Sequence, residues 1–499
     1  MKQKLLFILF VFASSAVAAK DCVVKAVGNG TTLNTTVIQK TIDDVSSHGG
    51  GTIVFPQGKY LTGAILLKPN VTLRLERGAV MMGSTNPYDY YTLPVEGGFA
   101  HDDNAPMALI MAKDASNIAL VGEGTIDGQG LQLALNIDSL HHRGIKVDPD
   151  YNVRRHRPSG NVRPKLFSFF GCRNITVEGL FLTNSACWGL SFNLCRNIDI
   201  QHVRILNRAY WNNDGIDISD CSHVKIMHND INSADDGICL KSHDASSYCD
   251  SITIEDCQVV SSSCAVKFGT ASYGGFRHVK VNNIRVFDTY RSAVAIECVD
   301  GGTIDEVEVQ NVDARNTGNA FLIRLGRRAG DRAGTLRNVT IRNLTADLSF
   351  GRPDLYYDLS GPDVDFFHNP FPSSIAGLPG LYIENVLIQN VEILCPGRAS
   401  KAMAYLPTWR LQDVPEEPTK YPEYNMFGEL PSYGVYVRHA RNVTFDNVHL
   451  LLKDADFRPA YVLDDAQGVT FRHITQHASV VARNSRVDDT GGIGVRYEK

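Results

Sequence analysis

Short runs of alternating apolar and polar residues recur along the chain at a nearly fixed interval. The apolar residues that open equivalent runs are Ile175, Ile198, Val224, Ile252, Val279 and Val307, which stand 23 to 28 residues apart, and further copies open at Val339, Val386, Val443 and Val469. Alternation with period two indicates β-strands, and helical periodicity is almost absent. A strand-only repeat of this length is typical of a solenoid whose coils stack on one another. We therefore predict an all-β fold, a single-stranded right-handed parallel β-helix.

A few segments depart from this repeat. The segment Thr36 to Ser46 is the best helix candidate, and we expect it to cap the open N-terminal end of the core. Gly51 to Gly83 resembles a first coil. Two long excursions, residues 131–164 and 405–432, interrupt the period. Excursions from a solenoid tend to wall its binding face. We expect residues 20–499 to form one β-helix domain.

Asparagine recurs immediately before the apolar residue of many runs, at Asn117, Asn174, Asn197, Asn338, Asn385 and Asn442. An Asn side chain at a fixed corner can bond the equivalent Asn one coil away, and Asn tolerates left-handed backbone geometry. Several of these positions also read Asn-x-Thr, the acceptor pattern for glycosylation. Because they stand at strand starts, we favour an asparagine ladder over glycosylation.

Eleven cysteines occur in the chain, and an odd number leaves at least one unpaired. Cys172, Cys195, Cys221 and Cys249 each lead into a strand in the same phase of the repeat. Adjacent rungs of a β-stack lie about 4.7–4.9 Å apart, within the Cα separations that disulfides span. Some bridges therefore remain open as an alternative, but we favour a stack of buried thiols.

Composition and the first residues bear on the compartment. The chain has 49 basic and 54 acidic side chains and a net charge of −5, which gives no electrostatic reason to bind nucleic acid or an anionic membrane. Residues 1–19 combine a basic start, a short apolar run and an Ala-x-Ala end, the pattern of a cleaved signal peptide. We expect a soluble secreted or periplasmic protein, with no membrane contact, and a monomer.

A second strand of each repeat can be aligned across the coils. The third and fifth positions of these segments are apolar and are expected to face the core, so the fourth position and the residue after the segment face outward. The aligned segments are Trp188–Phe192, Asp214–Ile218, Asp236–Leu240, Cys264–Phe268, Ser292–Ile296 and Asn319–Ile323.

This alignment brings three carboxylates into one patch. Asp214 and Asp236 stand on adjacent coils, and Asp235 is the neighbour of Asp236. Asp-Gly pairs are often only solvated turns, and a cluster of carboxylates can also bind calcium. Two such pairs in register, with a third carboxylate, favour acid–base chemistry, because like charges at close range shift each other's pKa. Paired carboxylates are also the apparatus of glycoside hydrolysis.

The same face carries side chains suited to an acidic sugar chain. Trp188 lies one coil before the carboxylates, and the later coils offer Lys241, Lys267, Glu297 and Arg324. Cations bind the acid groups of such a chain, and an aromatic face packs on a sugar ring. We therefore expect an acidic plant polysaccharide or its oligosaccharides as the partner, with no metal and no cofactor.

At these residues the sequence resembles glycoside hydrolase family 28, the pectin-degrading polygalacturonases. Asn212–Gly215 resembles the family's Asn-Thr-Asp-Gly motif with Asn213 in place of Thr, and Asp235–Lys241 resembles its Asp-Asp segment. The segments Gly124–Gly128 and Asn184–Trp188 extend the resemblance, which covers about residues 45 to 475. It implies an inverting hydrolase in which Asp235 is the general acid and Asp214 and Asp236 activate water, with Asn212 in the substrate site.

The sequence departs from the family at two motifs. The Gly-His-Gly motif falls at Ser263–Ala265, so its His is Cys264, and the Arg-Ile-Lys motif falls at Ala295–Glu297. We expect Glu297 to repel a carboxylate in subsite +1, which favours rhamnose or another neutral sugar there. Lys241, Lys267 or Arg324 would then hold galacturonate in subsite −1. The hypothesis is a rhamnogalacturonan galacturonidase or hydrolase, made exo-acting by the two excursions.

Three other readings stay open. The first is an exo-polygalacturonase that acts on homogalacturonan. The second is a non-catalytic β-helix that binds glycans, although a binder has little reason to retain three mutually repelling acids. The third is a calcium-dependent polysaccharide lyase on the same fold, for which the sequence offers no Arg base beside the Asp cluster.

Overall fold

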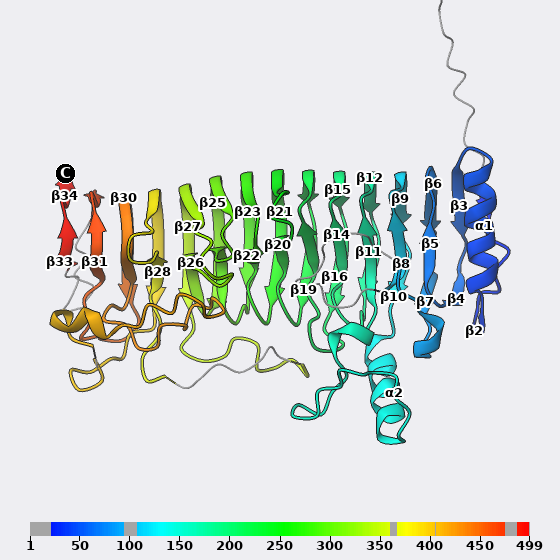
Figure 1. The fold of residues 1–499 in the computed structure, drawn as a ribbon, viewed down its shortest axis with the longest axis horizontal. Coiled ribbons are helices and arrows are strands. Elements are labelled where there is room, and N and C mark those ends of the chain that lie inside the picture. Colours follow the sequence, from blue (N-terminus) through cyan, green and yellow to red (C-terminus); the bar gives the residue numbers. More distant parts are fainter. Residues whose placement is uncertain (1–20, 94–106, 360–366, 405, 475–486, 499) are drawn as a thin grey trace, which may run out of the picture.

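The computed structural model describes residues 21–93, 107–359, 367–404, 406–474 and 487–498. Strands follow one another along the long axis of the molecule in sequence order, from β3 at one end to β34 at the other (Figure 1). The strand pairs are parallel, and each strand pairs with its counterpart on the next coil. The predicted right-handed parallel β-helix is thereby confirmed. The predicted signal peptide, residues 1–19, lies outside the described residues.

The described strands form three stacks. The first, which carries the Asp-Gly turns, consists of β5 (Ile65–Leu67), β8 (Ala108–Lys113), β11 (Lys165–Phe170), β14 (Leu190–Asn193), β17 (Ile216–Ser219), β20 (Ile238–Ser242), β22 (Val266–Ser272), β24 (Ser292–Cys298), β26 (Asn319–Leu325), β28 (Ser373–Ala376), β30 (Val435–Leu452), β31 (Tyr461–Gln467) and β33 (Val487–Ile493).

The second stack starts as β1 (Cys22–Val23), β3 (Gly51–Phe55), β6 (Val71–Leu75), β9 (Ser116–Gly122), β12 (Arg173–Glu178), β15 (Arg196–Gln201) and β18 (Ser222–Met227). The third starts as β2 (Asn29–Leu33), β4 (Gly58–Thr62), β7 (Ala79–Gly83), β10 (Thr125–Asp127), β13 (Phe181–Thr183), β16 (Arg204–Asn207) and β19 (Asp230–Ser233).

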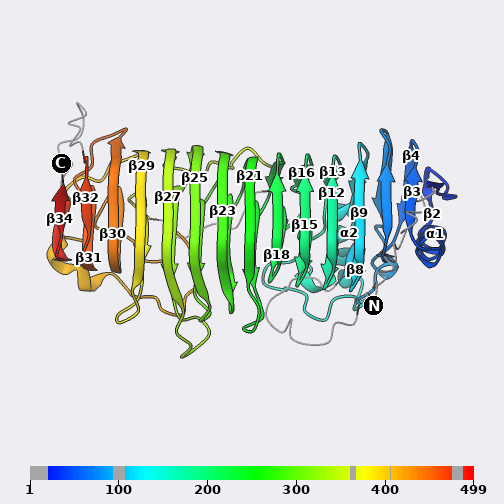
Figure 2. The same cartoon turned by 90° about the horizontal axis from the view of Figure 1, so that it is seen from above.

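From β21 onward these two stacks run together as long bent strands, which Figure 2 shows side by side from above. They are β21 (Cys249–Ser261), β23 (Gly275–Phe287), β25 (Thr303–Thr317), β27 (Thr335–Leu348), β29 (Ile383–Cys395) and β30, and the last short strands are β32 (Thr470–Arg472) and β34 (Arg496–Glu498).

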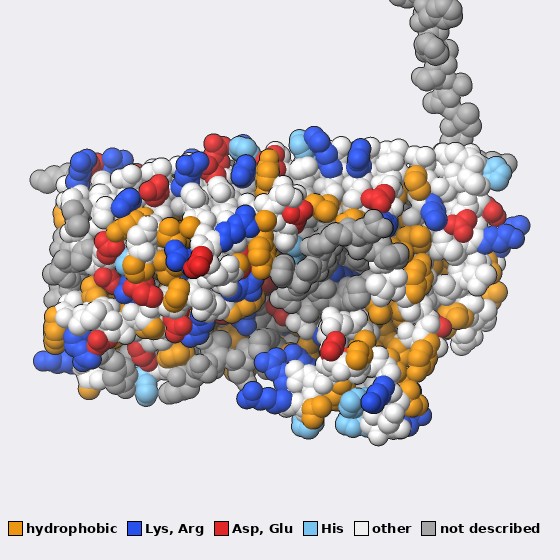
Figure 3. Space-filling model, viewed as in Figure 1, with side chains coloured by type: hydrophobic (Ala, Val, Ile, Leu, Met, Phe, Trp, Pro, Cys, Tyr) orange, Lys and Arg blue, Asp and Glu red, His pale blue; other side chains and the backbone are white. Residues whose placement is uncertain are grey.

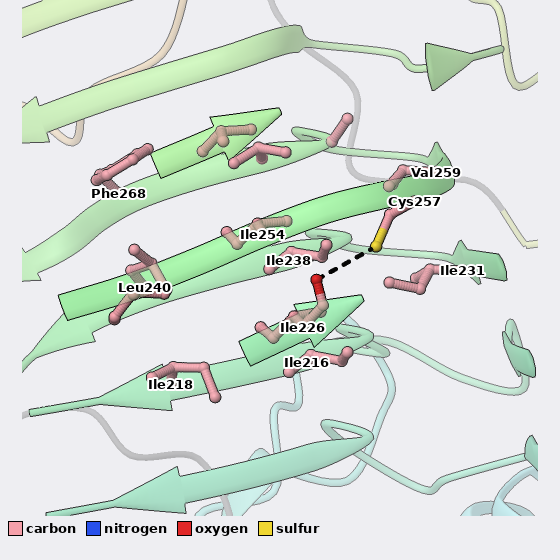
Figure 4. Close-up of a cluster of buried hydrophobic side chains, with 14 of the residues drawn as sticks. Ile216, Ile218, Ile226, Ile231, Ile238, Leu240, Ile254, Cys257, Val259 and Phe268 are labelled. Carbon is pink, nitrogen blue, oxygen red and sulfur yellow. Dashed lines mark hydrogen bonds between the residues drawn. The ribbon is translucent and has the colours of Figure 1, made fainter. Parts of the chain in front are cut away.

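The register of the first stack is the one that the sequence alignment predicts. Ile216 pairs with Ile238, Ile238 with Val266, and Val266 with Val294. These side chains are buried in the solenoid. Figure 4 shows the interior of these coils, where Ile and Leu side chains from successive rungs stack, and where the Cys257 thiol donates to the Ile226 carbonyl at 3.7 Å. The outward positions of the same strands are thereby fixed in space.

The asparagine ladder is confirmed. The amide Nδ2 donates to the Oδ1 of the equivalent Asn one coil earlier, at 2.8 Å from Asn174 to Asn117 and at 2.9 Å from Asn197 to Asn174, whereas Asn338 donates to Asp305. The ladder continues at Asn385 and Asn442. These residues have left-handed backbone geometry, with φ of 54° at Asn174, which Asn tolerates better than other residues with a side chain.

Replacing Asn174 by Ala should lower the free energy of unfolding by about 2–3 kcal/mol, since it removes two ladder bonds and leaves a Cβ residue in left-handed geometry. The Asn174→Gly variant keeps that geometry free of strain, and its expected loss is about 1 kcal/mol. Urea denaturation of both variants measures the two contributions separately. Equal stability of the Ala variant and the unsubstituted protein would contradict the ladder's structural role.

The cysteines are free thiols, as favoured from the sequence. Ten of the eleven are buried, and Cys22 is half-buried. Cys172, Cys195 and Cys221 stack along one corner, where the backbone N–H of Cys172 donates to the sulfur of Cys195 and that of Cys195 to the sulfur of Cys221, each at 3.3 Å. Burial raises the pKa of the Cys195 thiol well above its usual value, so this stack consists of inert thiols.

Two helices flank the described coils. Helix α1 (Thr35–Ser47) buries Ile38 and Ile42 against the first coils and covers the N-terminal end of the core, which confirms the predicted cap (Figure 1). Helix α2 (Gly130–His142) lies in the first excursion and was not predicted. Its buried residues, Gly130, Leu133, Ala134 and Ile137, have helical spacing, but the apolar residues on its exposed face, Leu131 and Leu135, obscure this period in the sequence. The 3₁₀ turns are η1 (Pro87–Asp89), η2 (Gly160–Val162) and η3 (Thr408–Asp413).

The second excursion packs along the side of the solenoid as a strap, defined here as residues 406–432. Its apolar side chains form a separate buried cluster with the outer face of the first stack, made of Ala376, Leu411, Val414, Met426, Phe427, Leu430, Tyr436 and Val462. No helix in the described part of the chain is long and apolar enough to cross a bilayer.

Candidate active site

The three carboxylates predicted from the alignment do meet. Asp214 lies just before β17, and Asp235 and Asp236 lie just before β20, one rung further along. One carboxyl oxygen from each lies within 4.8 Å of the others. The rungs can approach this closely because a glycine follows each turn: a Cβ at Gly215 would stand 2.4 Å from the Gly237 carbonyl oxygen.

Buried amides hold the Asp214 turn in place. Asn213 is fully buried, and its Oδ1 accepts hydrogen bonds from the backbone N–H groups of Ala209 and Tyr210, each at 2.7 Å. Its Nδ2 donates to the Cys187 carbonyl at 2.6 Å, and Asn207 donates to the Asp214 carbonyl at 2.8 Å. Asn213 thus fixes the backbone that presents Asp214, a role the sequence did not reveal.

The carboxylates line a hollow with a volume of about 90 Å³. Its walls are formed by Trp188, Asn212, Asp214, Asp235, Asp236, Lys241, His243, Lys267, Gly269, Thr270, Ala271, Arg328 and Tyr421. All three predicted catalytic residues line this hollow, and so do four of the six predicted substrate-binding residues. Trp188, Asn212, Lys241 and Lys267 lie in the hollow, whereas Glu297 and Arg324 do not line it.

Two buried ammonium groups neutralise part of the acid cluster. Lys267 Nζ lies 3.1 Å from Asp236 Oδ2 and 3.2 Å from the Tyr421 hydroxyl. Lys241 Nζ lies 2.5 Å from Asp217 Oδ1 and 3.6 Å from Asp214 Oδ2. The cluster has the ligand types of a calcium site, but these ammonium groups already lie against two of its three carboxylates. The donor set therefore fits acid–base chemistry better than a metal.

The environments separate the pKa values of the three acids. Burial raises the pKa of Asp235, and the neighbouring Asp236 adds to this effect. Burial and then Asp217 and Asp235 raise that of Asp214 well above its usual value. Burial acts in the same direction on Asp236, but Lys267 and Lys241 outweigh it and lower the pKa of that carboxyl to about 2. The cluster thus combines one carboxyl whose pKa is lowered with two neighbours whose pKa values are raised, and such a separation is what general acid–base catalysis uses.

Trp188 has a different place from the one expected. Its ring is almost fully buried between Lys165 and Lys241, whose Nζ atoms lie 4.5 Å and 4.3 Å from the ring centroid. Cation–π contacts of this kind stabilise both ammonium groups. The ring therefore orients Lys241 as well as lining the hollow, and it is not an open stacking platform.

The structure places Glu297 and Arg324 away from the predicted substrate contacts. Glu297 lies behind Gly269 and Thr270, and its Oε2 accepts from the Thr270 hydroxyl at 3.2 Å. Burial raises its pKa to about 8, against the opposing effect of Lys267. Arg324 donates to the backbone carbonyls of Gly377, Glu416 and Glu417 at 2.9, 2.8 and 3.0 Å. Arg324 anchors the strap to the solenoid, and neither side chain faces the substrate hollow.

Several residues of the site were missed from the sequence. Asp217 stands at the outward fourth position of the aligned segment Asp214–Ile218, so the alignment could have predicted that it faces the site. Tyr421 reaches the hollow from the strap, and Arg328 lies just after β26, held by two bonds to Asp300 at 2.9 and 2.8 Å. Neither position belongs to the strand repeat. His243, just after β20, also lines the hollow.

A further ion pair from the strap stands beside the acid cluster. The Arg291 guanidinium pairs with Glu423 and donates to the Ser263 hydroxyl at 3.1 Å. Arg291 opposes the rise in the pKa of Asp235. The strap therefore contributes two groups, Tyr421 and Glu423, to the surroundings of the carboxylates.

The sequence also matches a known protein family. The model of the family described as glycosyl hydrolases family 28 matches residues 52–347. A probable polygalacturonase of Vitis vinifera is 26% identical over 426 residues, which cover 78% of this chain and 75% of that protein. An exo-poly-alpha-D-galacturonosidase of Dickeya chrysanthemi is 28% identical over 243 residues, 43% of this chain and 40% of that protein.

Solved structures agree on the fold. A family 28 exopolygalacturonase of Yersinia enterocolitica superposes with a TM-score of 0.67 at 18% identity, over 91% of this chain and 78% of that one. A polygalacturonase from Erwinia carotovora ssp. carotovora gives a TM-score of 0.55 at 18% identity, over 75% of this chain and 93% of that one.

Proposed function

Because the chain belongs to glycosyl hydrolases family 28 and is an O-glycosidase of the pectin-degrading, polygalacturonase type, we propose that it removes terminal α-galacturonosyl residues from a pectin backbone with inversion. The observation that carries this proposal is the division of labour in one hollow: Asp236 is held ionised by Lys267, while the pKa of Asp235 is raised. Asp235 then protonates the leaving oxygen, and Asp236 deprotonates the attacking water.

Asp214 completes this arrangement. Its raised pKa favours the protonated form, which cannot accept a proton from water, so the deprotonation is assigned to Asp236, whose pKa is lowered. A carboxyl with an oxygen within 4.8 Å of oxygens of Asp235 and Asp236 can hold the attacking water between them. Lys241, which lies between Asp214 and Asp217, balances the charge that remains on this side of the hollow.

Exo action is supported by the walls of the hollow. On the earlier coils, the first excursion lies against the site: Arg163 donates to Asn212 Oδ1 at 2.8 Å and to the Trp211 carbonyl at 2.6 Å. On the later coils, the strap brings Tyr421 into the hollow. A site bounded on both sides along the solenoid suits the end of a chain better than its middle. The exo-acting relative from Dickeya chrysanthemi agrees with this proposal.

The leaving sugar has two candidates. Arg328 lines the hollow on the later coils, and its Nη1 is not used in the pair with Asp300, which favours a carboxylate and hence galacturonate. The second candidate, rhamnose or another neutral sugar, rests on the motif change at Ala295–Glu297. Its argument from repulsion by Glu297 loses force, because that side chain lies behind Thr270 and its pKa is raised to about 8.

The test incubates the protein separately with homogalacturonan oligosaccharides and with rhamnogalacturonan backbone oligosaccharides, and resolves the products by mass. Free galacturonate from homogalacturonan, released one residue at a time, is the expected result. Galacturonate from the rhamnogalacturonan oligosaccharides alone would select the neutral leaving sugar instead. No hydrolysis of either would overturn the proposal.

The anomeric configuration of the first product tests inversion. Carboxyl groups of inverting glycosidases generally stand about 6.5–9.5 Å apart and those of retaining ones about 5–5.5 Å apart, whereas the nearest carboxyl oxygens here lie within 4.8 Å of one another. The family resemblance implies inversion despite this short approach, which is measured between oxygens and not between whole groups. Proton NMR at early times should show β-galacturonate first, and an initial α-anomer would contradict inversion.

Export is part of the same proposal. A polymeric wall substrate has to be met outside the cytoplasm, and residues 1–19 have the pattern of a cleaved leader. N-terminal sequencing of the protein recovered from outside the producing cells should begin near residue 19 or 20. Recovery of the intact N-terminus from the cytoplasm alone would contradict export.

A further inference from the structure

A turn in the first excursion presents an arginine beside the active-site hollow. Two backbone hydrogen bonds close this turn: the Asn152 N–H donates to the Arg157 carbonyl at 3.0 Å, and the Arg157 N–H donates to the Asn152 carbonyl at 3.3 Å. The Asn152 side chain also accepts from the backbone N–H of Arg155 at 2.9 Å. The backbone of Arg157 is therefore held at a fixed point of the excursion.

Trp211 holds the Arg157 side chain against the wall of the hollow. The Arg157 guanidinium lies over the Trp211 ring, with its central carbon 4.5 Å from the ring centroid. Trp211 is the chain neighbour of Asn212, which lines the hollow. The buried Arg163 fixes both residues, because it donates to the Trp211 carbonyl at 2.6 Å and to Asn212 Oδ1 at 2.8 Å. Arg157 thus stands beside the rim of the hollow, on the side of the earlier coils.

The Arg157 guanidinium has its hydrogen-bond donors free. It makes no hydrogen bond or ion pair with any residue that the structure describes, and its nitrogens are accessible to solvent. The carboxylates of the excursion are engaged by neutral donors, Asp138 by Tyr151, Asp148 by Ser159 and Asp150 by Asn161. No carboxylate of the described part of the excursion therefore neutralises this arginine.

Positive charge accumulates around Arg157. Burial and then the neighbouring Arg163 and Arg155 lower the pKa of Arg157 to about 10. Tyr210 and Asp235 act in the opposite direction, so the charge of this arginine is felt at the acid cluster. Figure 3 shows Lys and Arg side chains gathered along the edge of the lobe around α2, on the side that faces the later coils. Like charges that lack a carboxylate between them are stabilised by a bound anion.

The cations that the sequence suggested for the galacturonate carboxylate are engaged elsewhere. Lys241 and Lys267 lie against carboxylates of the site itself, and Arg324 anchors the strap. Arg328 lines the hollow on the later coils, where the leaving sugar is placed. Arg157 supplies the cation that is then missing on the side of the earlier coils.

We propose that Arg157 binds the carboxylate of the terminal galacturonate, the sugar whose glycosidic bond is cleaved. A planar guanidinium offers the two parallel N–H groups that a carboxylate accepts, and the stack on Trp211 orients its plane. The assignment rests on the proposed function for its substrate class. It makes Arg157 a specificity-determining residue, which favours an acidic terminal sugar over a neutral one, and it gives the first excursion a binding role besides that of a wall.

The binding of two simple glycosides tests this role apart from catalysis. Methyl α-galacturonopyranoside carries a carboxylate where methyl α-galactopyranoside carries a hydroxymethyl group, and the two are otherwise alike. In a saturation-transfer NMR titration of the full chain, the galacturonoside should bind about 10- to 100-fold more tightly, the gain expected of one charge-assisted pair. The Arg157→Gln variant should lose most of this preference, with its affinity for the galactoside unchanged.

The matched control is Arg154→Gln, because Arg154 is an exposed arginine of the same turn; it should keep the preference. Arg157→Lys retains the charge without the planar fork and should keep part of the preference. Melting temperatures of the three variants are measured alongside, and a loss confined to the galacturonoside separates recognition of the carboxylate from a disturbed turn.

The proposal is overturned if the galacturonoside does not saturate, if Arg157→Gln keeps the preference, or if Arg154→Gln lowers it equally. Neither glycoside has to be hydrolysed for this result. A protein that binds galacturonate through Arg157 but releases none from oligosaccharides would therefore contradict the proposed function and leave this inference standing.

Discussion

Replacing Asp235 by Asn should lower kcat on an oligogalacturonide by about 10³-fold, within the 10²–10⁴-fold range that a general acid contributes. The reason is that Asn keeps the shape of the side chain and its acceptor for the Asp236 N–H but has no proton to give to the leaving oxygen. Initial rates of galacturonate release measure the effect.

The identity of the leaving group separates an acid role from a structural one. An aryl α-galacturonide expels a stable phenolate and needs little protonation, so the Asp235→Asn variant should lose much less activity on it. The Asp236→Asn variant lacks the base and should lose activity on both substrates. Asp456→Asn is the matched control, because Asp456 is a buried, ion-paired carboxylate outside the hollow; it should affect stability and not kcat. Equal losses of Asp235→Asn on both substrates would assign Asp235 another role.

Replacing Lys267 by Met should shift the acidic limb of the pH profile to higher pH. Lys267 stands 3.1 Å from Asp236 and is the strongest of the interactions that hold the pKa of this carboxyl near 2. Without the ammonium group, burial raises that pKa, and the base becomes protonated at pH values where it is now ionised. We expect kcat/KM at pH 4 to fall by more than tenfold, with a smaller loss near pH 7.

The direction of the shift is what identifies the effect. Breaking a buried ion pair also costs about 3–5 kcal/mol of stability, so melting temperatures are measured with the rates. The control is Lys453→Met, which removes an ammonium group that pairs with Asp347 and does not line the hollow; its acidic limb should stay in place. An unchanged acidic limb in Lys267→Met would mean that Asp236 is not the base.

The sequence was sufficient for the parts of the molecule that repeat. Alternation with period two placed Ile216, Ile238 and Val266 in the core, and the same alignment brought Asp214 and Asp236 onto adjacent rungs. The asparagine ladder followed from a corner that recurs in phase. In each case one physical constraint, the stacking of equivalent positions, acts many times along the chain, so that the pattern can be read without a structure.

The parts of the site that do not repeat could not be predicted in this way. Tyr421 and Glu423 come from a segment without periodicity, and their positions depend on how the strap closes over the first stack. The ion-pair partners of the lysines could not be predicted either. Lys267 and Lys241 face outward as predicted, but which carboxylate each one neutralises depends on distances of a few ångströms. Glu297 shows the limit most clearly, because its rung was predicted correctly while Thr270 and Gly269 lie between it and the hollow.

The anchoring of the strap has a consequence for how the enzyme is made. Arg324 binds the strap through Glu416 and Glu417, and Arg438, on β30, pairs with the same Glu416. A growing chain can stack its early coils as they emerge, since each coil contacts mainly its neighbours, and so can assemble Asp214, Asp235 and Asp236 early. Tyr421 and Glu423 arrive only with the strap, and the strap's second anchor, Arg438, is synthesised after them. The carboxylates are therefore in place long before the site is closed, and a nascent chain carries its acids without the wall that encloses their substrate.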